Sequence, residues 1–143
     1  MEKNITFKFT EKNFANPNQM QALTLAYIGD SIYDIMSREY VMKNHLGKIN
    51  DLHKTVSTIV SARAQASFME NILNNGILTE QEEKIYNRAK NQKNNSKAKN
   101  ASIMEYKLAT GLEAVFGYLY LEKNFERLEE MFNYIIKLYE EKQ

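Results

Sequence analysis

Helix-breaking residues are scarce along this chain. Its 143 residues include five glycines and one proline, Pro17, so few strong breakers interrupt the segments in which apolar residues recur. These residues return at the three- and four-residue intervals of an amphipathic helix, as in Leu108, Leu112 and Val115. A hydrophobic content of 43% suits one compact domain with a real core. The sequence therefore predicts a single all-α domain.

Several residues mark where the helices should begin and end. Pro17 with Asn18 is a typical helix start, and the run Asn74-Asn75-Gly76 is typical of a helix C-terminus. Thr79 with Glu82 three positions later has the pattern of a capping box. The expected helical segments are 17–36, 50–60, 61–73, 79–88, 101–124 and 125–139, with a break at Asn124 between the last two. Four tyrosines are expected among the core positions of these helices: Tyr27, Tyr33, Tyr118 and Tyr120.

Composition excludes several kinds of chemistry. There is no cysteine, so disulfides, thiolate catalysis and cysteine-ligated zinc are ruled out. Two dispersed histidines are too few for a histidine-rich metal site, and the remaining oxygen ligands favour magnesium or a similar hard ion. The N-terminus lacks the apolar core of a signal peptide, and no uncharged apolar run reaches the length of a bilayer span. We expect a cytoplasmic protein with no membrane contact.

Two acidic residues, Asp30 and Glu113, stand alone in apolar segments. No other charged side chain lies between Lys12 and Asp30, and Glu113 is alone between residues 107 and 122. An ionised carboxylate in such surroundings is costly unless it is paired, hydrogen-bonded or bound to a cation, and one divalent ion would satisfy both. Gly29 and Gly117 would let two helices approach closely beside these acids. The residues alone leave two alternatives open. One is plain helix packing, and the other is a simple salt-bridge ladder of Asp30, Asp34 and Arg38, which are four residues apart on one helix face.

A basic stretch without acidic residues runs over 88–99. Such a segment can bind the phosphates of a nucleic acid even though the net charge of the whole chain is only +1. A solvated lysine-rich connector is an equal alternative. The candidate phosphate ligands are Arg88, Lys90, Lys93, Lys97 and Lys99.

Four blocks of the sequence resemble one family. Leu25-Ala-Tyr-Ile-Gly-Asp-Ser-Ile-Tyr-Asp34 resembles the signature helix of ribonuclease III domains, and its variant is similar to that of Mini-ribonuclease III, the short bacterial branch without a double-stranded-RNA-binding domain. The other blocks are residues 50–54 with 59–65, residues 88–91, and residues 106–122. The likeness spans roughly residues 20–140. The predicted organisation is an N-terminal arm, 1–16, and a catalytic domain, 17–143, with a basic RNA-binding loop at about 88–100.

The resemblance implies a specific activity. It identifies Asp30 and Glu113 as the metal-binding catalytic acids of a magnesium-dependent endoribonuclease that cleaves double-stranded RNA, with manganese as a possible substitute. Full-size enzymes carry two further acids, at the positions of Ala26 and Thr110 here, and their lack agrees with the Mini branch. This leaves the number of metal ions open.

The resemblance also implies partners. It predicts a homodimer that receives one RNA duplex, and a role in maturation of 23S ribosomal RNA precursor, with an accessory ribosomal protein as a possible partner. The alternative function is a non-catalytic protein that binds double-stranded RNA or the ribosome and keeps the fold.

Overall fold

The computed structural model describes residues 16–44, 47–92 and 102–143, so residues 1–15 of the expected N-terminal arm lie outside it. Within these ranges the chain forms helices and no strand, which confirms the all-α prediction. The elements in chain order are the 3-10 helix η2 (Pro17–Gln19), α1 (Ala22–Asn44), α2 (Ile49–Val60), α3 (Ala62–Asn74), α4 (Glu80–Lys90), α5 (Ile103–Leu121) and α6 (Phe125–Glu141).

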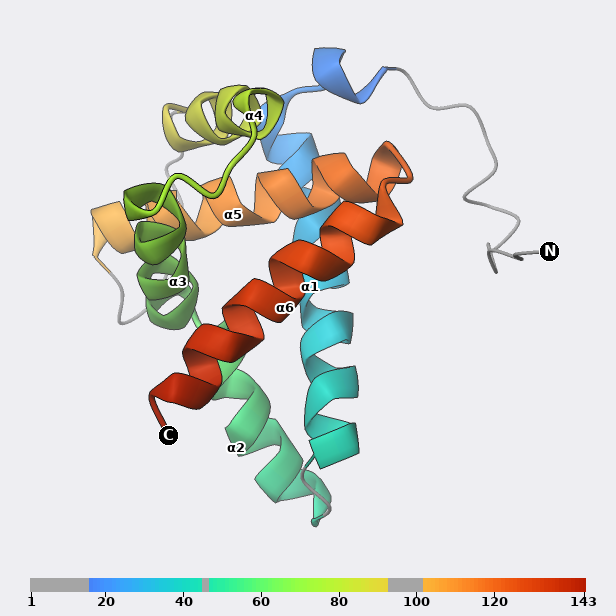
Figure 1. Cartoon of the computed structure of the whole chain (residues 1–143), viewed down its shortest axis with the longest axis vertical. Coiled ribbons are helices and arrows are strands. Elements are labelled where there is room, and N and C mark those ends of the chain that lie inside the picture. Colours follow the sequence, from blue (N-terminus) through green and yellow to red (C-terminus); the bar gives the residue numbers. More distant parts are fainter. Residues whose placement is uncertain (1–15, 45–46, 93–101) are drawn as a thin grey trace, which may run out of the picture.

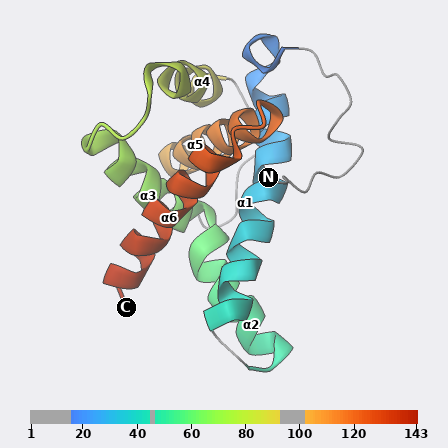
Figure 2. The same ribbon diagram turned by 45° about the vertical axis from the view of Figure 1, so that its right-hand side comes forward.

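Helix α5 is the central element of the fold. Eleven of its 19 residues are buried, which is the pattern of a helix surrounded on all sides rather than one lying on a surface. Helix α1 crosses α5, while α3, α4 and α6 pack against it (Figure 1). Helix α2 lies beside the C-terminal half of α1, at the end of the molecule away from α4 (Figure 2).

The crossing of α1 and α5 depends on two glycines. A Cβ atom added to Gly29 would lie 1.7 Å from the backbone oxygen of Glu113, and one added to Gly117 would lie 1.9 Å from the backbone oxygen of Leu25. Neither distance is physically possible, so no residue with a side chain fits at either position without moving the helices apart. The expectation that these glycines permit a close approach of two helices is confirmed.

Side chains cap the starts of α4, α5 and α6, and the cap of α4 is the capping box predicted at Thr79. Thr79 and Glu82 form a capping box at α4, and Ser102 with Glu105 forms a second one at α5. Such boxes satisfy two backbone N–H groups that have no partner within the helix. Asn124 caps α6 with its side chain. The turn after α3 contains Gly76 at φ 61°, the left-handed conformation that glycine adopts without strain.

Some helix boundaries differ from the expected ones. Pro17 opens the 3-10 helix η2, and α1 begins only at Ala22 and continues to Asn44, well beyond residue 36. Helix α4 continues to Lys90, so Arg88 and Lys90 belong to its last turn rather than to a loop. Position 27 also differs: Tyr27 was expected among the core residues, but it is 80% exposed. It lies on the face of α1 that points away from the other helices.

A buried ion pair fixes α6 to α4. The carboxylate of Glu82, which is 2% exposed, accepts two hydrogen bonds from Arg127, at 2.8 and 2.9 Å. Arg127 also donates to the backbone oxygen of Ile77 at 2.8 Å. Buried charges are stable only when they are paired and hydrogen-bonded, and these bonds meet that requirement for Glu82 and Arg127. No helix among the described residues is long and apolar enough to cross a bilayer.

Candidate active site

Asp30 and Glu113 come together at the crossing of α1 and α5. Asp30 directly follows Gly29, whose backbone packs against that of Glu113. The carboxylate of Asp30 is near enough to raise the pKa of Glu113, both by charge repulsion and as a hydrogen-bond partner. Two acids 83 residues apart in the sequence therefore form one acidic pair, Asp30/Glu113.

Glu113 has a strongly perturbed acidity. Burial is the largest cause and the charge of Asp30 is the second, and together they raise its pKa to about 8. A hydrogen bond from Gln65 acts in the opposite direction but is outweighed. An ionised carboxylate that is half-buried beside a second acid is poorly stabilised on its own. A cation placed between the two carboxylates would stabilise both in their charged form.

The donor set of this pair fits a hard divalent ion. Both side chains offer carboxylate oxygens, and magnesium commonly takes one or two protein carboxylates while water and phosphate complete its shell. Among the described residues no group of three or more acidic, histidine or cysteine side chains could hold a metal. The neighbours Ala26 and Thr110 are each 7% exposed and carry no carboxylate. Asp30 and Glu113 would therefore be the protein ligands of such an ion.

Gln65 is a site residue that the sequence did not reveal. Its side chain is 2% exposed and donates from Nε2 to Glu113 Oε2 at 3.3 Å and to the backbone oxygen of Val60 at 2.9 Å. One signal was present in the sequence. Gln65 shares a helical face with the buried residues Met69 and Ile72, and a polar residue on such a face needs hydrogen-bond partners.

The predicted RNA-binding residues have different surroundings. Arg88 is half-buried and donates to the backbone oxygens of Asn18, at 2.9 Å, and Met20, so it ties α4 to η2. The ammonium group of Lys90 lies 5.9 Å from the ring centre of Tyr86. The remaining candidates, Lys93, Lys97 and Lys99, lie outside the described residues.

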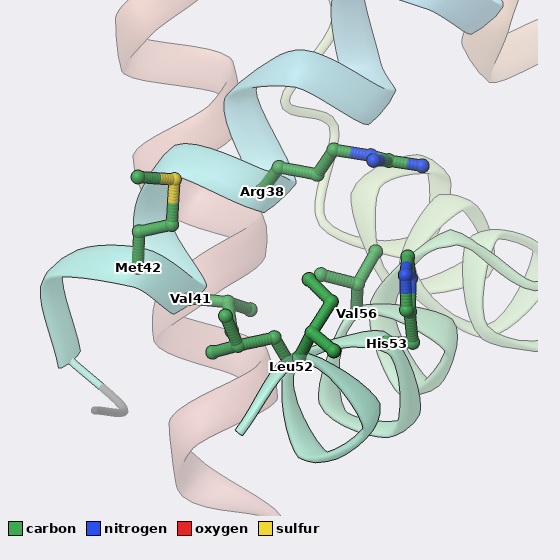
Figure 3. Close-up of a pocket in the computed structure, with 7 residues that line it drawn as sticks. Arg38, Val41, Met42, Leu52, His53 and Val56 are labelled. Atoms are coloured by element: carbon green, nitrogen blue, oxygen red, sulfur yellow. The ribbon is translucent and has the colours of Figure 1, made fainter. Parts of the chain in front are cut away.

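A separate apolar hollow lies between α1 and α2, and neither Asp30 nor Glu113 lines it. Met42 and Leu52 are among its walls, with Arg38 and His53 at its edges (Figure 3). Arg38 also pairs with Asp34 at 2.9 Å, which confirms that part of the predicted salt-bridge ladder.

Comparison with known proteins places the chain in a family. Residues 23–124 match the model of the ribonuclease III domain. A Mini-ribonuclease 3 from Enterococcus faecalis is 46% identical over 83% of this chain and 90% of its own length. The Mini-ribonuclease 3 from Clostridium tetani is also 46% identical, over 94% of this chain and 86% of its own length.

A solved structure shares both fold and sequence. The crystal structure of protein FN1578 from Fusobacterium nucleatum superimposes with a TM-score of 0.73 at 35% identity, covering 83% of this chain and 93% of that one. The long matches in sequence and the common helical fold agree with each other. The chain belongs to the ribonuclease III family, and within it to the Mini-ribonuclease III branch.

Proposed function

We propose that this endoribonuclease of the ribonuclease III type cleaves double-stranded RNA with a divalent metal ion held by Asp30 and Glu113. One observation carries the assignment: the crossing of α1 and α5 brings together two acids from distant segments, and their mutual repulsion contributes to the raised pKa of Glu113. Acids perturbed in this way are typical of catalytic sites. Magnesium is the proposed ion, with manganese as a substitute.

The two acids differ in solvent exposure, and this gives them different roles in binding the ion. Asp30 is exposed and can meet an ion that arrives with RNA, whereas Glu113 is half-buried and fixed between helices. A divalent ion held by Asp30 and Glu113 would supply the chemistry common to such sites, which is activation of water for attack on the phosphodiester and stabilisation of the leaving oxygen. The remaining ligands would come from water and RNA phosphate oxygens, because Ala26 and Thr110 offer no carboxylate.

We propose that the functional unit is a homodimer formed through α1. Tyr27, Ile35 and Met42 are 80%, 56% and 62% exposed, and their spacing of eight and seven residues places them on one side of the helix. These three side chains, the α1 strip, are large exposed apolar groups on the outer side of the helix that carries Asp30. Covering it with a second copy would remove it from water and set two acidic pairs on one assembly.

The proposed substrate is a duplex in 23S ribosomal RNA precursor. Affinity would come from the charges of Arg88, Lys90, Lys93, Lys97 and Lys99, because an A-form duplex is contacted mainly through phosphates and 2′-hydroxyls. Arg88 contributes its charge while it stays bonded to η2. An accessory ribosomal protein that shapes the RNA, and a cytoplasmic location, belong to the same proposal.

Cleavage assays with matched acid variants test this function. Purified protein is incubated with a structured fragment of precursor ribosomal RNA in magnesium, in manganese and in chelator. We expect metal-dependent cuts that are lost in Asp30→Asn and Glu113→Gln, while both variants still retain RNA in a gel-shift assay. Glu39→Gln, which makes the same kind of change at another exposed position of α1, should cleave normally.

The other outcomes are equally informative. Undiminished cleavage by Asp30→Asn or Glu113→Gln would remove the acidic pair from the mechanism. RNA retention by the unaltered protein without any cuts in either metal would instead support the non-catalytic alternative.

A further inference from the structure

Gln65 connects three helices at one buried point. It lies near the start of α3, its amide donates to the last residue of α2, and the same amide reaches Glu113 on α5. Two other buried polar side chains have simpler roles, since Ser37 donates to the backbone of its own helix and Glu82 is paired with Arg127. The hydrogen bond to Glu113 distinguishes Gln65 from these two.

The orientation of the amide is determined by its surroundings. The Val60 backbone oxygen only accepts hydrogens, and Glu113 Oε2 does the same when the carboxylate is ionised, as it is with a cation bound. If the amide were turned over, its oxygen would face these two acceptors and neither bond could form. The NH₂ group must therefore point toward Glu113, and it holds one oxygen of that carboxylate.

Holding α2 in place does not by itself explain this residue. The hydroxyl group of Tyr33 already donates to the backbone oxygen of Ile59, the residue before Val60, at 2.9 Å. The amide also has a cost, since Oε1 of Gln65 is buried without a hydrogen-bond partner among the described residues. A buried acceptor without a partner destabilises a fold. An apolar side chain of similar length would fill the space without that cost.

The backbone and the side chain of Glu113 are thus fixed by different contacts. Gly29 packs against its backbone, as the 1.7 Å distance for an added Cβ shows. The side chain beyond it has several rotatable bonds, and the bond from Gln65 restricts its outer end. Mutation of a residue that orients a metal ligand in this way typically lowers metal affinity or activity by about 10- to 100-fold.

We propose that Gln65 is a positioning residue that holds the carboxylate of Glu113 in the orientation required to bind the divalent ion. The inference rests on the proposed role of Glu113. It predicts that removing the amide weakens metal binding without weakening RNA binding, because the side chain of Gln65 is buried.

The test variant is Gln65→Met, which keeps the length of the side chain and removes its hydrogen bonds. Ile72→Val is the matched control, since Ile72 is buried two turns further along the same face of α3 and carries no hydrogen-bonding side chain. Free manganese is measured by electron paramagnetic resonance in titrations of the RNA-free protein. Cleavage rates are measured against magnesium concentration and against RNA concentration.

We expect Gln65→Met to raise the manganese dissociation constant and the half-saturating magnesium concentration about tenfold or more, with an unchanged KM for RNA. Ile72→Val should lower thermal stability but leave both metal constants unchanged. Metal constants of Gln65→Met equal to those of Ile72→Val would overturn the inference. If Gln65→Met does not fold, Gln65→Asn serves instead, because its shorter amide cannot span both partners.

Glu113→Gln distinguishes failure of the proposed metal site from failure of the positioning role of Gln65. If it binds manganese and cleaves RNA as the unaltered protein does, the proposed site is wrong and the role of Gln65 falls with it. If Glu113→Gln no longer binds metal and Gln65→Met still binds it normally, the site stands and only the positioning role fails.

Discussion

At the scale of single residues, the two acids of the site have the same sequence surroundings but different exposure. Asp30 is exposed, whereas Glu113 is half-buried with a pKa raised to about 8. The difference arises from their helices. Helix α5 is surrounded by others, while α1 presents one side to solvent. An isolated charge in an apolar run therefore indicates a special position, but its burial depends on the tertiary arrangement.

The raised pKa of Glu113 predicts how stability of the metal-free protein depends on pH. The ordinary pKa of the residue is 4.5, which we take for the unfolded chain, and the value in the folded protein is about 8. Between these values the folded state binds more protons than the unfolded state, so the free energy of unfolding falls as pH rises from about 4.5 to about 8. The slope from this one group is at most about 1.4 kcal/mol per pH unit.

Urea unfolding in chelator at several pH values measures this effect. Glu113→Gln removes the titrating group, so its stability relative to the unaltered protein should rise between the two pKa values, from about 4.5 to about 8. Glu122→Gln, an acid-to-amide change at the exposed end of α5, should show no such trend. A stability difference between Glu113→Gln and the unaltered protein that stays constant over this range would mean that Glu113 ionises normally.

Residue patterns in the sequence predicted the two acids of the site but not the glutamine that contacts one of them. Asp30 and Glu113 stand out by their isolation and by the family resemblance, and the structure brings them together. Gln65 had no assigned role, because its hydrogen bond with Glu113 joins α3 to α5 across 48 positions. Local patterns report neighbours along one helix, and they contain no information about which side chains meet across helices.

At the scale of helices, the crossing of α1 and α5 is the arrangement on which the site depends. Gly29→Ala would place a methyl group against the backbone of Glu113, so the helices must separate. We expect the free energy of unfolding to fall by about 3 kcal/mol or more, at the upper end for overpacked positions. The same change would displace Glu113 from Asp30, so cleavage should fall even where the variant remains folded.

Gly47→Ala is the matched control for that prediction. A Cβ atom at Gly47 would lie 3.6 Å from the Cβ of Asp51, which is an ordinary van der Waals distance. Denaturation curves of the two variants should differ widely, with the midpoint of Gly47→Ala close to that of the unaltered protein. Equal midpoints would contradict the view that the glycine sets the distance between the helices.

Helix ends were predicted well where a side chain or a turn specifies them. Thr79 and Asn124 cap the helices that follow them, and Gly76 forms the turn after α3, because these residues satisfy backbone groups within a few positions. The start at Pro17 was only partly right. Proline fits the first turn of either helix type, and the 3-10 helix η2 ends before α1 begins at Ala22.

At the scale of the whole molecule, the exposed side of α1 explains why Tyr27 was misplaced by the sequence. Apolar residues occur around most of this helix, so periodicity does not separate the side that packs against α5 from the side that remains outside. The α1 strip, formed by Tyr27, Ile35 and Met42, is the surface that the proposed homodimer would cover.

Ile35→Glu tests the dimer directly. A carboxylate in the middle of the α1 strip would oppose its own copy across the interface, so we expect monomers in analytical ultracentrifugation. Ile103→Glu makes the same change at a 65% exposed position of α5 outside the strip and should leave the mass unchanged. A dimer that persists in Ile35→Glu would place the interface elsewhere.

The basic segment predicts how RNA affinity depends on salt. Each phosphate neutralised by a lysine releases bound counterions, so the logarithm of the binding constant falls with the logarithm of salt concentration in proportion to the number of phosphates bound. Replacing Lys93, Lys97 and Lys99 by glutamine should weaken binding and make this slope shallower by roughly one unit for each phosphate that is no longer neutralised. Lys123→Gln and Lys137→Gln, at the other end of the chain, should leave the slope unchanged. Because Asp30 and Glu113 are untouched in these variants, cleavage at saturating RNA should persist, and its disappearance would mean that the segment also arranges the acidic pair.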